Sequence, residues 1–527
     1  MIPVVRQGLG GLGSMSTSRR LALAALCGVF AGGAMAPYHL VFLLVPGFSG
    51  LLWLIASVDR KRSAFSTGWA FGVGHFATGF YWVSHAFLVD AARYGWMAPV
   101  AVLGLAAGMA LFTGFTALIS WQISRKLRLN LIGQVLILAA VWTAFEWVRS
   151  WLFTGFPWNL VGTVWAFSDT MMQFSAFGGL YSLGMVTVAV AAMPVVLIDN
   201  NRWRVGAVAL GVSVLGLGVI WAAGAWRLSG AVTEYVPDIK LRLVQPNIAQ
   251  NLKWKSGYKV GHIKKQAALS LLTPKDGVPP THIIWAETAV PFNLVHDKRL
   301  LSYLGQIAPK NGYLITGAPR SSAPGAANPK YWNSLHAIAP GGSIDAVYDK
   351  VHLVPFGEYV PFRNILNVSK LTAGRVDFSP GDGARVWDLP GLPAVAPLIC
   401  YEAIFPAEVT SLDGHPEWLL NVTNDAWFGL SAGPYQHFAN VRFRAVEMGL
   451  PLIRVANTGI SAVVDAYGRV GEHLDLGVEG IVDSRLPKRL SDRPPYGRFG
   501  DWITLVLILG FLALGALQRT RQAQRSE

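Results

Sequence analysis

Three residues with reactive side chains, Glu287, Lys350 and Cys400, each come directly after a short apolar run of the sequence. The runs that precede them read HIIWA, AVYD and VAPLI. Loops at the ends of strands are where α/β folds gather catalytic groups. We therefore expect this carboxylate, ammonium and thiol to meet at one site.

A thiol beside a base and a cation can perform nucleophilic acyl transfer. With an ordinary pKa near 8.5, a cysteine is only a few per cent thiolate at pH 7, so it needs help to react. We predict that Glu287 takes the proton of Cys400 and that Lys350 stabilises the oxyanion formed when the sulfur attacks a carbonyl. The alternatives are a buried structural cysteine and solvated surface positions for the other two residues.

The composition predicts a membrane protein of more than one unit. The chain has 527 residues, of which 52% are hydrophobic and 14% charged, and its mean hydropathy is +0.39. These values lie far from those of soluble proteins. The net charge of +14 could suggest a nucleic-acid partner, but the basic residues cluster between apolar segments, as membrane topology requires. We expect no nucleic-acid binding.

Eight apolar segments could cross a bilayer, whose hydrocarbon core is ~30 Å thick. They lie at 21–36, 39–58, 67–89, 96–121, 130–148, 171–198, 205–225 and 502–517. The first ends in Ala-Met-Ala, so a cleaved signal peptide is the alternative to a retained span. Cys27 lies within this segment, and with only two cysteines in the chain a disulfide framework is not expected.

Basic residues set the predicted orientation of these spans. Arg93 and Arg149 occupy short loops on one side, and a larger set falls on the other: Arg6, Arg19, Arg20, Arg60, Lys61, Arg62, Arg125, Lys126, Arg128, Arg202, Arg204, Arg519, Arg521 and Arg525. The basic side is cytoplasmic by the positive-inside rule. We expect a membrane domain at 1–226, a periplasmic domain at 227–496, and a closing span with a cytoplasmic tail at 497–527.

Polar residues in the membrane half have mostly structural explanations. Glu146 and Arg149, three apart near the outer end of a span, are expected to pair. The aromatic loop 153–159 is expected to lie in the interfacial belt of the bilayer. His75 and His85 are expected to be satisfied interior groups.

Segment 227–496 has the pattern of an α/β domain. Short runs rich in Ile, Val and Leu lie at 239–244, 282–286, 313–316, 346–348, 395–399, 418–422, 451–455 and 462–464. Polar helical stretches at 256–272 and 437–449 separate some of them.

Four ordered motifs give this domain its resemblance to a known family. They are WAET at 285–288, KVHLVPFGEYVPF at 350–362, CYE at 400–402 and NDAWFG at 424–429. They resemble the nitrilase superfamily, whose catalytic Glu, Lys and Cys occur in this order. Together with the apolar spans, the chain resembles the membrane-bound apolipoprotein N-acyltransferase family of bacterial envelopes.

The resemblance implies a fold and a reaction. The fold would be a periplasmic four-layer αββα sandwich joined to a bundle of eight helices in the bacterial inner membrane. Cys400 would take a fatty-acyl chain from a phospholipid, usually phosphatidylethanolamine, as a thioester. The free amine of a diacylglyceryl-cysteine at a lipoprotein N-terminus would then accept that chain, in a ping-pong reaction at the bilayer surface.

The resemblance also implies supporting residues. Glu287 would act as base and then as acid, and Lys350 with the Tyr401 backbone N–H would form the oxyanion site. Glu358 would orient the triad, with Glu402 beside it. The substrate contacts would be Trp254, Trp427 and Phe428.

No metal or other cofactor is expected. His352 lies two residues after Lys350, but no ligand spacing accompanies it, and a Cys400–His352 dyad fits less well than the Glu-Lys-Cys set. The segment 359–362 and the loop 156–158 are candidate floors or lids over an acyl channel.

Two other functions are compatible with parts of the sequence. A membrane-tethered amidase would let water resolve the thioester, but a tether needs a single span. A transporter with a periplasmic receptor domain would need charged groups along its pathway, and the spans carry few.

Overall fold

The computed structural model describes residues 15–198, 203–361, 377–411 and 414–519. Some residues on which predictions rest lie outside these ranges: Arg6, Arg202, Phe362, Arg521 and Arg525. The described chain forms two compact units. One comprises the residues up to Ser84, Trp96–Gly230 and those from Arg498 onward, and the other comprises His85–Gly95 and Ala231–Gly497.

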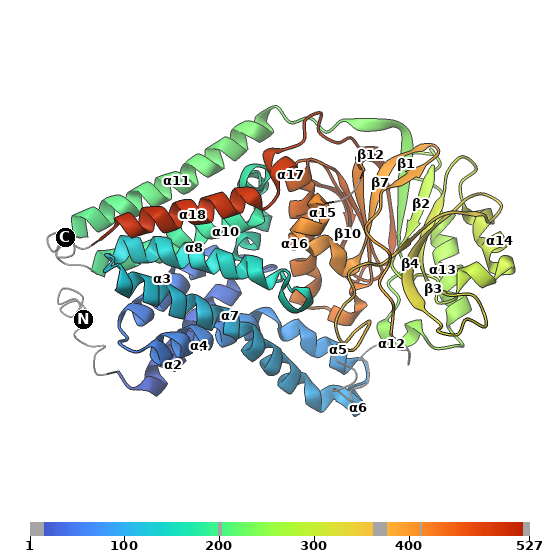
Figure 1. Cartoon of the computed structure of the whole chain (residues 1–527). Coiled ribbons are helices and arrows are strands. Elements are labelled where there is room, and N and C mark those ends of the chain that lie inside the picture. The colour runs from blue at the N-terminus through green and yellow to red at the C-terminus, as the bar shows by residue number, and fades with distance from the viewer. Residues whose placement is uncertain (1–14, 199–202, 362–376, 412–413, 520–527) are drawn as a thin grey trace. The chain divides into compact units, whose positions relative to one another are not determined.

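The first unit is helical (Figure 1). Each of the eight predicted spans overlaps one of its main helices, which are α2 (Thr17–Gly33), α3 (Leu44–Ala56), α4 (Lys61–Gly79), α7 (Ala98–Lys126), α8 (Leu131–Arg149), α10 (Ser175–Ala192), α11 (Trp203–Ser229) and α18 (Trp502–Leu517). An apolar cluster that includes Phe48, Phe71 and Trp142 packs α3, α4 and α8 together.

Four helical stretches in the described residues are long and apolar enough to cross a membrane by themselves: Ala91–Lys126, Leu131–Arg149, Ser175–Ile198 and Trp203–Ser229. Two further apolar helices, Val41–Ala56 and Trp502–Leu517, are shorter. The predicted span at 67–89 is interrupted, because α4 ends at Gly79 and a short helix, α5 (Ser84–Leu88), follows. These helices support a membrane protein, and the number of eight spans stays a prediction.

Glu146 and Arg149 on α8 contact the backbone of the chain that follows their helix, and their pairing with each other stays a prediction. The Arg149 Nη1 donates to the backbone oxygens of Phe156 and Trp158, at 2.8 and 2.6 Å. The Val161 N–H donates to Glu146 Oε1 at 2.9 Å. Both side chains therefore fix the aromatic loop that follows their helix.

The second unit contains two six-stranded sheets. The first has the order β12-β1-β2-β3-β4-β5, formed by Gly480–Pro487, Tyr235–Gln245, His282–Trp285, Leu314–Ser321, Tyr331–Ile338 and Ile344–Asp349. The second has the order β11-β10-β9-β8-β7-β6, formed by Val470–Leu474, Ser461–Val464, Leu452–Ala456, Trp418–Thr423, Leu392–Ile399 and Trp387–Leu389. Strands β1 to β3 and strands β7 to β9 run parallel, and the other neighbours are antiparallel.

The two sheets pack face to face between two layers of helices, as Figure 1 shows. Helices α13 (Lys259–Ser270) and α14 (Lys298–Ile307) cover the first sheet, and α15 (Pro406–Thr410) and α16 (Ala432–Met448) lie beside the second. Side chains such as Ile284 and Val422 fill the space between the sheets. Parallel strands are buried on both faces, which explains their continuous apolar runs.

Candidate active site

The three reactive residues follow three strands of the two sheets. Glu287 comes two residues after β2, Lys350 directly after β5 and Cys400 directly after β7. The Lys350 ammonium lies 3.7 Å from Glu287 Oε1. The Cys400 thiol is close enough to both charges for them to shift its pKa. The structure therefore brings together the three side chains that the sequence singled out.

Two hydrogen bonds fix the Glu287 carboxylate. Asn333 Nδ2, from β4, donates to Oε1 at 2.7 Å. The backbone N–H of Asn424 donates to Oε2 at 2.8 Å. With one donor on each oxygen, the carboxylate has a defined orientation toward Lys350.

Lys350 is held between two carboxylates. Its Nζ lies 2.9 Å from Glu358 Oε2, closer than to Glu287, and only 1% of the lysine is exposed. Burial by itself lowers the pKa of Lys350, but the charge of Glu358 and then that of Glu287 outweigh it, so the pKa lies well above its ordinary value. Lys350 is thus a permanent cation, and Glu358 has the contacts expected of an orienting group.

Cys400 sits in a strained turn. Its φ of 54° lies in the left-handed region, which costs free energy for a residue other than glycine. Burial, and then the Glu287 charge, raise the pKa of the thiol, while the Lys350 cation and a hydrogen bond with the Thr423 side chain lower it in part. The resting thiol is therefore protonated, and a base must remove its proton before it attacks.

Glu402 joins the two strand ends that carry Lys350 and Cys400. Its Oε1 accepts from the backbone N–H of Val351 at 2.7 Å and from the Tyr348 hydroxyl at 2.9 Å. Its Oε2 accepts from the N–H of Ile399 at 2.6 Å. Burial raises the pKa of this carboxyl to about 7. The residue links the first sheet to the second beside the candidate site.

The neighbouring aromatic and histidine side chains have contacts of their own. Tyr401 is buried and packs edge-on against Phe405, at 4.9 Å between ring centroids. His352 stacks on Phe405 at 3.9 Å, and its Nδ1 lies 2.5 Å from Glu408. These contacts engage His352 with Glu408, so the geometry favours the Glu-Lys-Cys set over a Cys400–His352 dyad.

The comparisons with known proteins agree along the whole chain. A family model described as the apolipoprotein N-acyltransferase N-terminal domain matches residues 27–193, and the carbon-nitrogen hydrolase model matches residues 277–491. A curated apolipoprotein N-acyltransferase from Rhodopseudomonas palustris is 39% identical over 520 residues, which covers 95% of each chain. The relative from Bradyrhizobium diazoefficiens is 40% identical over 528 residues, covering 96% of each. The chain belongs to the apolipoprotein N-acyltransferase family.

The two-sheet unit is accordingly nitrilase-like, and the chain is a membrane protein of an enzyme family. Among solved structures, an amidase of the nitrilase superfamily from Nesterenkonia AN1 is 17% identical, with a TM-score of 0.35. That match covers 49% of this chain and 94% of the amidase.

The three predicted substrate contacts of this family member are half-buried. Trp254 directly follows α12 (Gln250–Lys253), and the Lys259 ammonium lies 5.7 Å from the centre of its ring. Trp427 and Phe428 lie on the short helix η9 (Asp425–Phe428) directly after Asn424. Their positions near the Glu287 partners fit the predicted role, which stays a prediction.

Sequence reasoning missed a buried polar network beneath Cys400. Asp425 Oδ2 accepts from Arg454 Nη2 at 2.8 Å, and Asp425 Oδ1 accepts from the Thr423 hydroxyl at 2.9 Å. His437 Nε2 lies 3.3 Å from the backbone oxygen of Cys400, and Asn421 Nδ2 donates to the same oxygen at 3.2 Å. The network therefore holds the main chain of the cysteine turn.

Asp425 and Arg454 stabilise each other's charge as an ion pair. Asp425 and Arg454 are both fully buried. Burial acts to raise the pKa of Asp425, but Arg454 and then His437 outweigh it and lower the pKa to about 2. The signal in the sequence was Arg454 inside the apolar run of β9, since a buried charge needs a partner. Among the residues that the structure describes, no group of three or more His, Cys, Asp or Glu is arranged to hold a metal ion.

Proposed function

We propose that this protein transfers a fatty-acyl chain from a phospholipid to the N-terminal amine of a diacylglyceryl-cysteine in apolipoproteins, by a ping-pong mechanism. Full-length similarity to curated apolipoprotein N-acyltransferases supports this activity. The observation that carries the mechanism is the meeting of Glu287, Lys350 and Cys400 at three strand ends. Phosphatidylethanolamine is the proposed donor.

In the first half-reaction Glu287 takes the proton of the Cys400 thiol as the sulfur attacks the ester carbonyl. The negative charge that forms on the carbonyl oxygen is stabilised by the Lys350 ammonium and the Tyr401 backbone N–H. The bond from the acyl carbon to the ester oxygen then breaks. Glu287 returns its proton to that oxygen, which leaves as the alcohol of a lysophospholipid, and the acyl chain remains as a thioester.

In the second half-reaction the lipoprotein amine attacks the thioester carbon. Glu287 takes a proton from the attacking nitrogen, and the same two groups stabilise the oxyanion. The carbon–sulfur bond breaks, the sulfur regains a proton from Glu287, and an amide is released. The fixed orientation of the carboxylate, with one donor on each oxygen, suits a group that accepts and returns a proton in each half.

The proposal includes the location of the site. We place it on the periplasmic side of the inner membrane, in a domain at 227–496 between a seven-span segment at 1–226 and a closing span at 497–527. The distribution of basic residues and the lipid nature of both substrates support this arrangement. A cysteine introduced at the exposed Asp276 should react with a membrane-impermeant thiol reagent from the periplasmic side only, and labelling from the cytoplasm would contradict the arrangement.

The experiment that tests the mechanism is mass spectrometry of the Cys400 peptide. Purified protein is incubated with phosphatidylethanolamine, and we expect acyl mass on Cys400 together with lysophospholipid. Cys400→Ala should abolish the adduct, and the matched Cys27→Ala should retain it. Release of lysophospholipid without modification of Cys400 would overturn the covalent mechanism.

The match to the carbon-nitrogen hydrolase model leaves a membrane-tethered amidase as the alternative function. A second step of the experiment distinguishes this amidase from the acyltransferase. A diacylated lipopeptide is added to the labelled acyl-enzyme. Transfer of the label to the peptide amine supports the acyltransferase, and release of free fatty acid supports the amidase. Family membership removes the basis for the transporter hypothesis.

A further inference from the structure

Lys253 is a buried cation for which the mechanism above has no role. It is the last residue of α12, and only 3% of it is exposed. Its Nζ donates to the backbone oxygen of Glu287 at 3.1 Å. Burying an ammonium is costly unless it is paired or hydrogen-bonded, so its place at the Glu287 turn needs an explanation.

The turn that Lys253 holds is strained. Thr288, the residue after Glu287, has a φ of 46°, an unfavourable value for a β-branched side chain. Strain of this kind persists only where the surroundings determine the backbone firmly. The hydrogen bond from Lys253 to the Glu287 oxygen is one of the contacts that fix this backbone.

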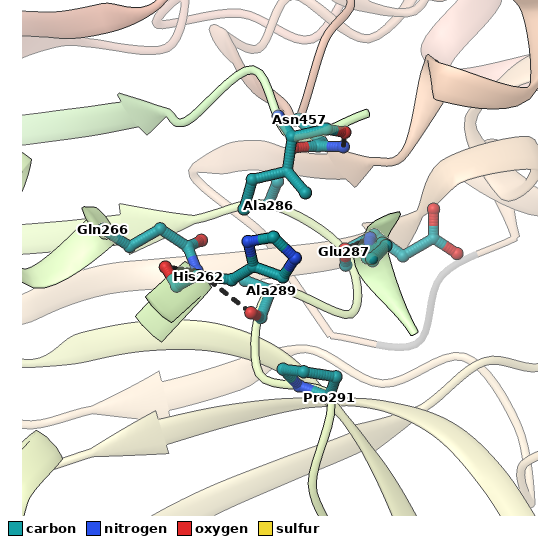
Figure 2. Close-up of a pocket in the computed structure, with 9 residues that line it drawn as sticks. His262, Gln266, Ala286, Glu287, Ala289, Pro291 and Asn457 are labelled. Carbon is teal, nitrogen blue, oxygen red and sulfur yellow. Dashed lines mark hydrogen bonds between the residues drawn. The ribbon is translucent and has the colours of Figure 1, made fainter. Parts of the chain in front are cut away.

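The ammonium borders a small cavity behind the turn. The cavity has a volume of about 10 Å³, room for one water molecule, and its lining includes Lys253, His262, Gln266 and Asn457. Figure 2 shows the Glu287 carboxylate pointing away from His262 and Gln266. Lys253 binds the backbone oxygen of Glu287, whereas the carboxylate of Glu287 lies 3.7 Å from the Lys350 ammonium. Little water screens the charge of Lys253.

Lys253 adds a second positive charge near Glu287. Glu287 and Glu358 are two carboxylates, both less than one-tenth exposed, and Lys350 supplies a single cation between them. Lys253 is a second cation, close enough to Glu287 for the two charges to interact. Cys400 also interacts with the Lys253 charge, and His262, whose Nε2 lies 3.2 Å from the Leu252 oxygen, lines the same cavity.

We propose that Lys253 is a positioning residue that acts through Glu287, holding its turn in place and keeping its carboxylate ionised for proton transfer from Cys400. This inference rests on the proposed function. A nearby cation favours the ionised form of a carboxylate, and the effect is strong where solvent is excluded. Burial lowers the pKa of Lys253 to about 8, opposed by the charges of Glu287 and Cys400, so the cation is present at pH 7 and is lost above pH 8.

The test compares Lys253→Met, Lys253→Gln and the matched control Lys255→Met, which changes an exposed lysine two residues away. The rate of Cys400 acylation by phosphatidylethanolamine is measured by mass spectrometry across pH. We expect the acid-side midpoint of the Lys253→Met rate to lie about one pH unit higher than that of the wild type, so that acylation is about tenfold slower at pH values below both midpoints.

Lys253→Gln separates the charge from the hydrogen bond, because its amide can still donate to the Glu287 oxygen. We expect it to share the displaced midpoint, and Lys255→Met to match the wild type. A wild-type profile in Lys253→Gln would overturn the proposed charge effect, and an unchanged rate and midpoint in Lys253→Met would overturn the whole inference. If Lys253→Met fails to fold, Lys253→Gln decides. Absence of an adduct in the wild type would instead count against the proposed function.

Discussion

The two sheets of the α/β unit hold their reactive residues by different means. On the first sheet, Glu287 and Lys350 are surrounded by charged groups that act on them directly, above all Glu358 at 2.9 Å from the ammonium. On the second sheet, the ion pair of Asp425 and Arg454 lies beneath the Cys400 turn, and its partners hold the cysteine backbone.

The first sheet therefore controls the charge of its reactive side chains, and the second controls the backbone geometry of Cys400. Changes around Glu287 should alter reaction rates and their pH dependence, because they change which protonation state is present. Changes around Asp425 should alter stability and the geometry of the turn, because that ion pair is fully buried. Four substitutions test the contrast.

The largest effect is expected on the first sheet. Glu287→Gln keeps the shape of the side chain but removes the base, and a positioned general base contributes roughly 10²–10⁴-fold. We expect Cys400 acylation to slow by about a thousandfold with little change in the thermal midpoint. The control is Glu472→Gln, at an exposed glutamate. Acylation at the wild-type rate would show that another group takes the proton.

On the second sheet the expected loss is one of stability. Arg454→Met leaves Asp425 fully buried without its cation, and breaking a buried pair costs roughly 3–5 kcal/mol. We expect the free energy of unfolding to fall by about 3 kcal/mol, measured by denaturant titration in detergent. Arg489→Met, at a half-exposed arginine, should have little effect. Equal losses in the two variants would remove the contrast between the sheets.

The ion pair of Asp425 and Arg454 should also make the stability of the protein depend on pH. The pKa of Asp425 is lowered from 3.8 to about 2 in the folded protein. The ionised Asp425 therefore adds roughly 2 kcal/mol to the free energy of unfolding above pH 3.8, and this contribution is lost as the pH falls toward 2. Unfolding midpoints measured across this range should fall steeply in the wild type. Asp425→Asn should flatten that part of the curve, and an equally steep fall in the variant would contradict the assignment.

The smallest effect concerns the shape of the Glu287 turn. A Cβ on Gly317 would lie 2.4 Å from the Thr288 nitrogen and 2.8 Å from the Glu287 Cα, so Gly317→Ala must displace the turn. We expect acylation to slow by about tenfold, the effect of a ~1.4 kcal/mol loss. Gly261→Ala, where a Cβ meets open space, is the control. Normal kinetics in Gly317→Ala would show that the turn tolerates movement.

Much of the α/β unit was predictable because its central strands are buried on both faces. Every predicted apolar run lies within or overlaps a strand, namely β1, β2, β3, β5, β7, β8, β9 and β10. Four strands were missed: β4, β6, β11 and β12. β11 (VGEHL) is largely exposed and polar, and β6 has three residues. β12 carries Asp483, Ser484 and Arg485 in its middle, and β4 buries the polar side chains of Asn333 and His336. Periodicity could not separate these from loops.

The reactive residues were predictable because each ends an apolar run, whereas their partners were not. Asn333 reaches Glu287 from 46 residues away, and pairing across a sheet depends on a register that the sequence does not reveal. Lys253 had no comparable signal, because no apolar run precedes it to place it at a strand end. Only Arg454, a charge within an apolar strand, carried a readable sign of a buried partner.

The pairing of β1 with β12 brings the two ends of the strand-bearing segment together. These strands are the first and last of the α/β unit, and they run antiparallel with Tyr235 opposite Pro487. The segment that carries the strands therefore begins and ends at adjoining points, the arrangement that lets one domain be inserted into another. A short linker that joins the chain just before β1 to the chain just after β12 would therefore remove the twelve described strands together.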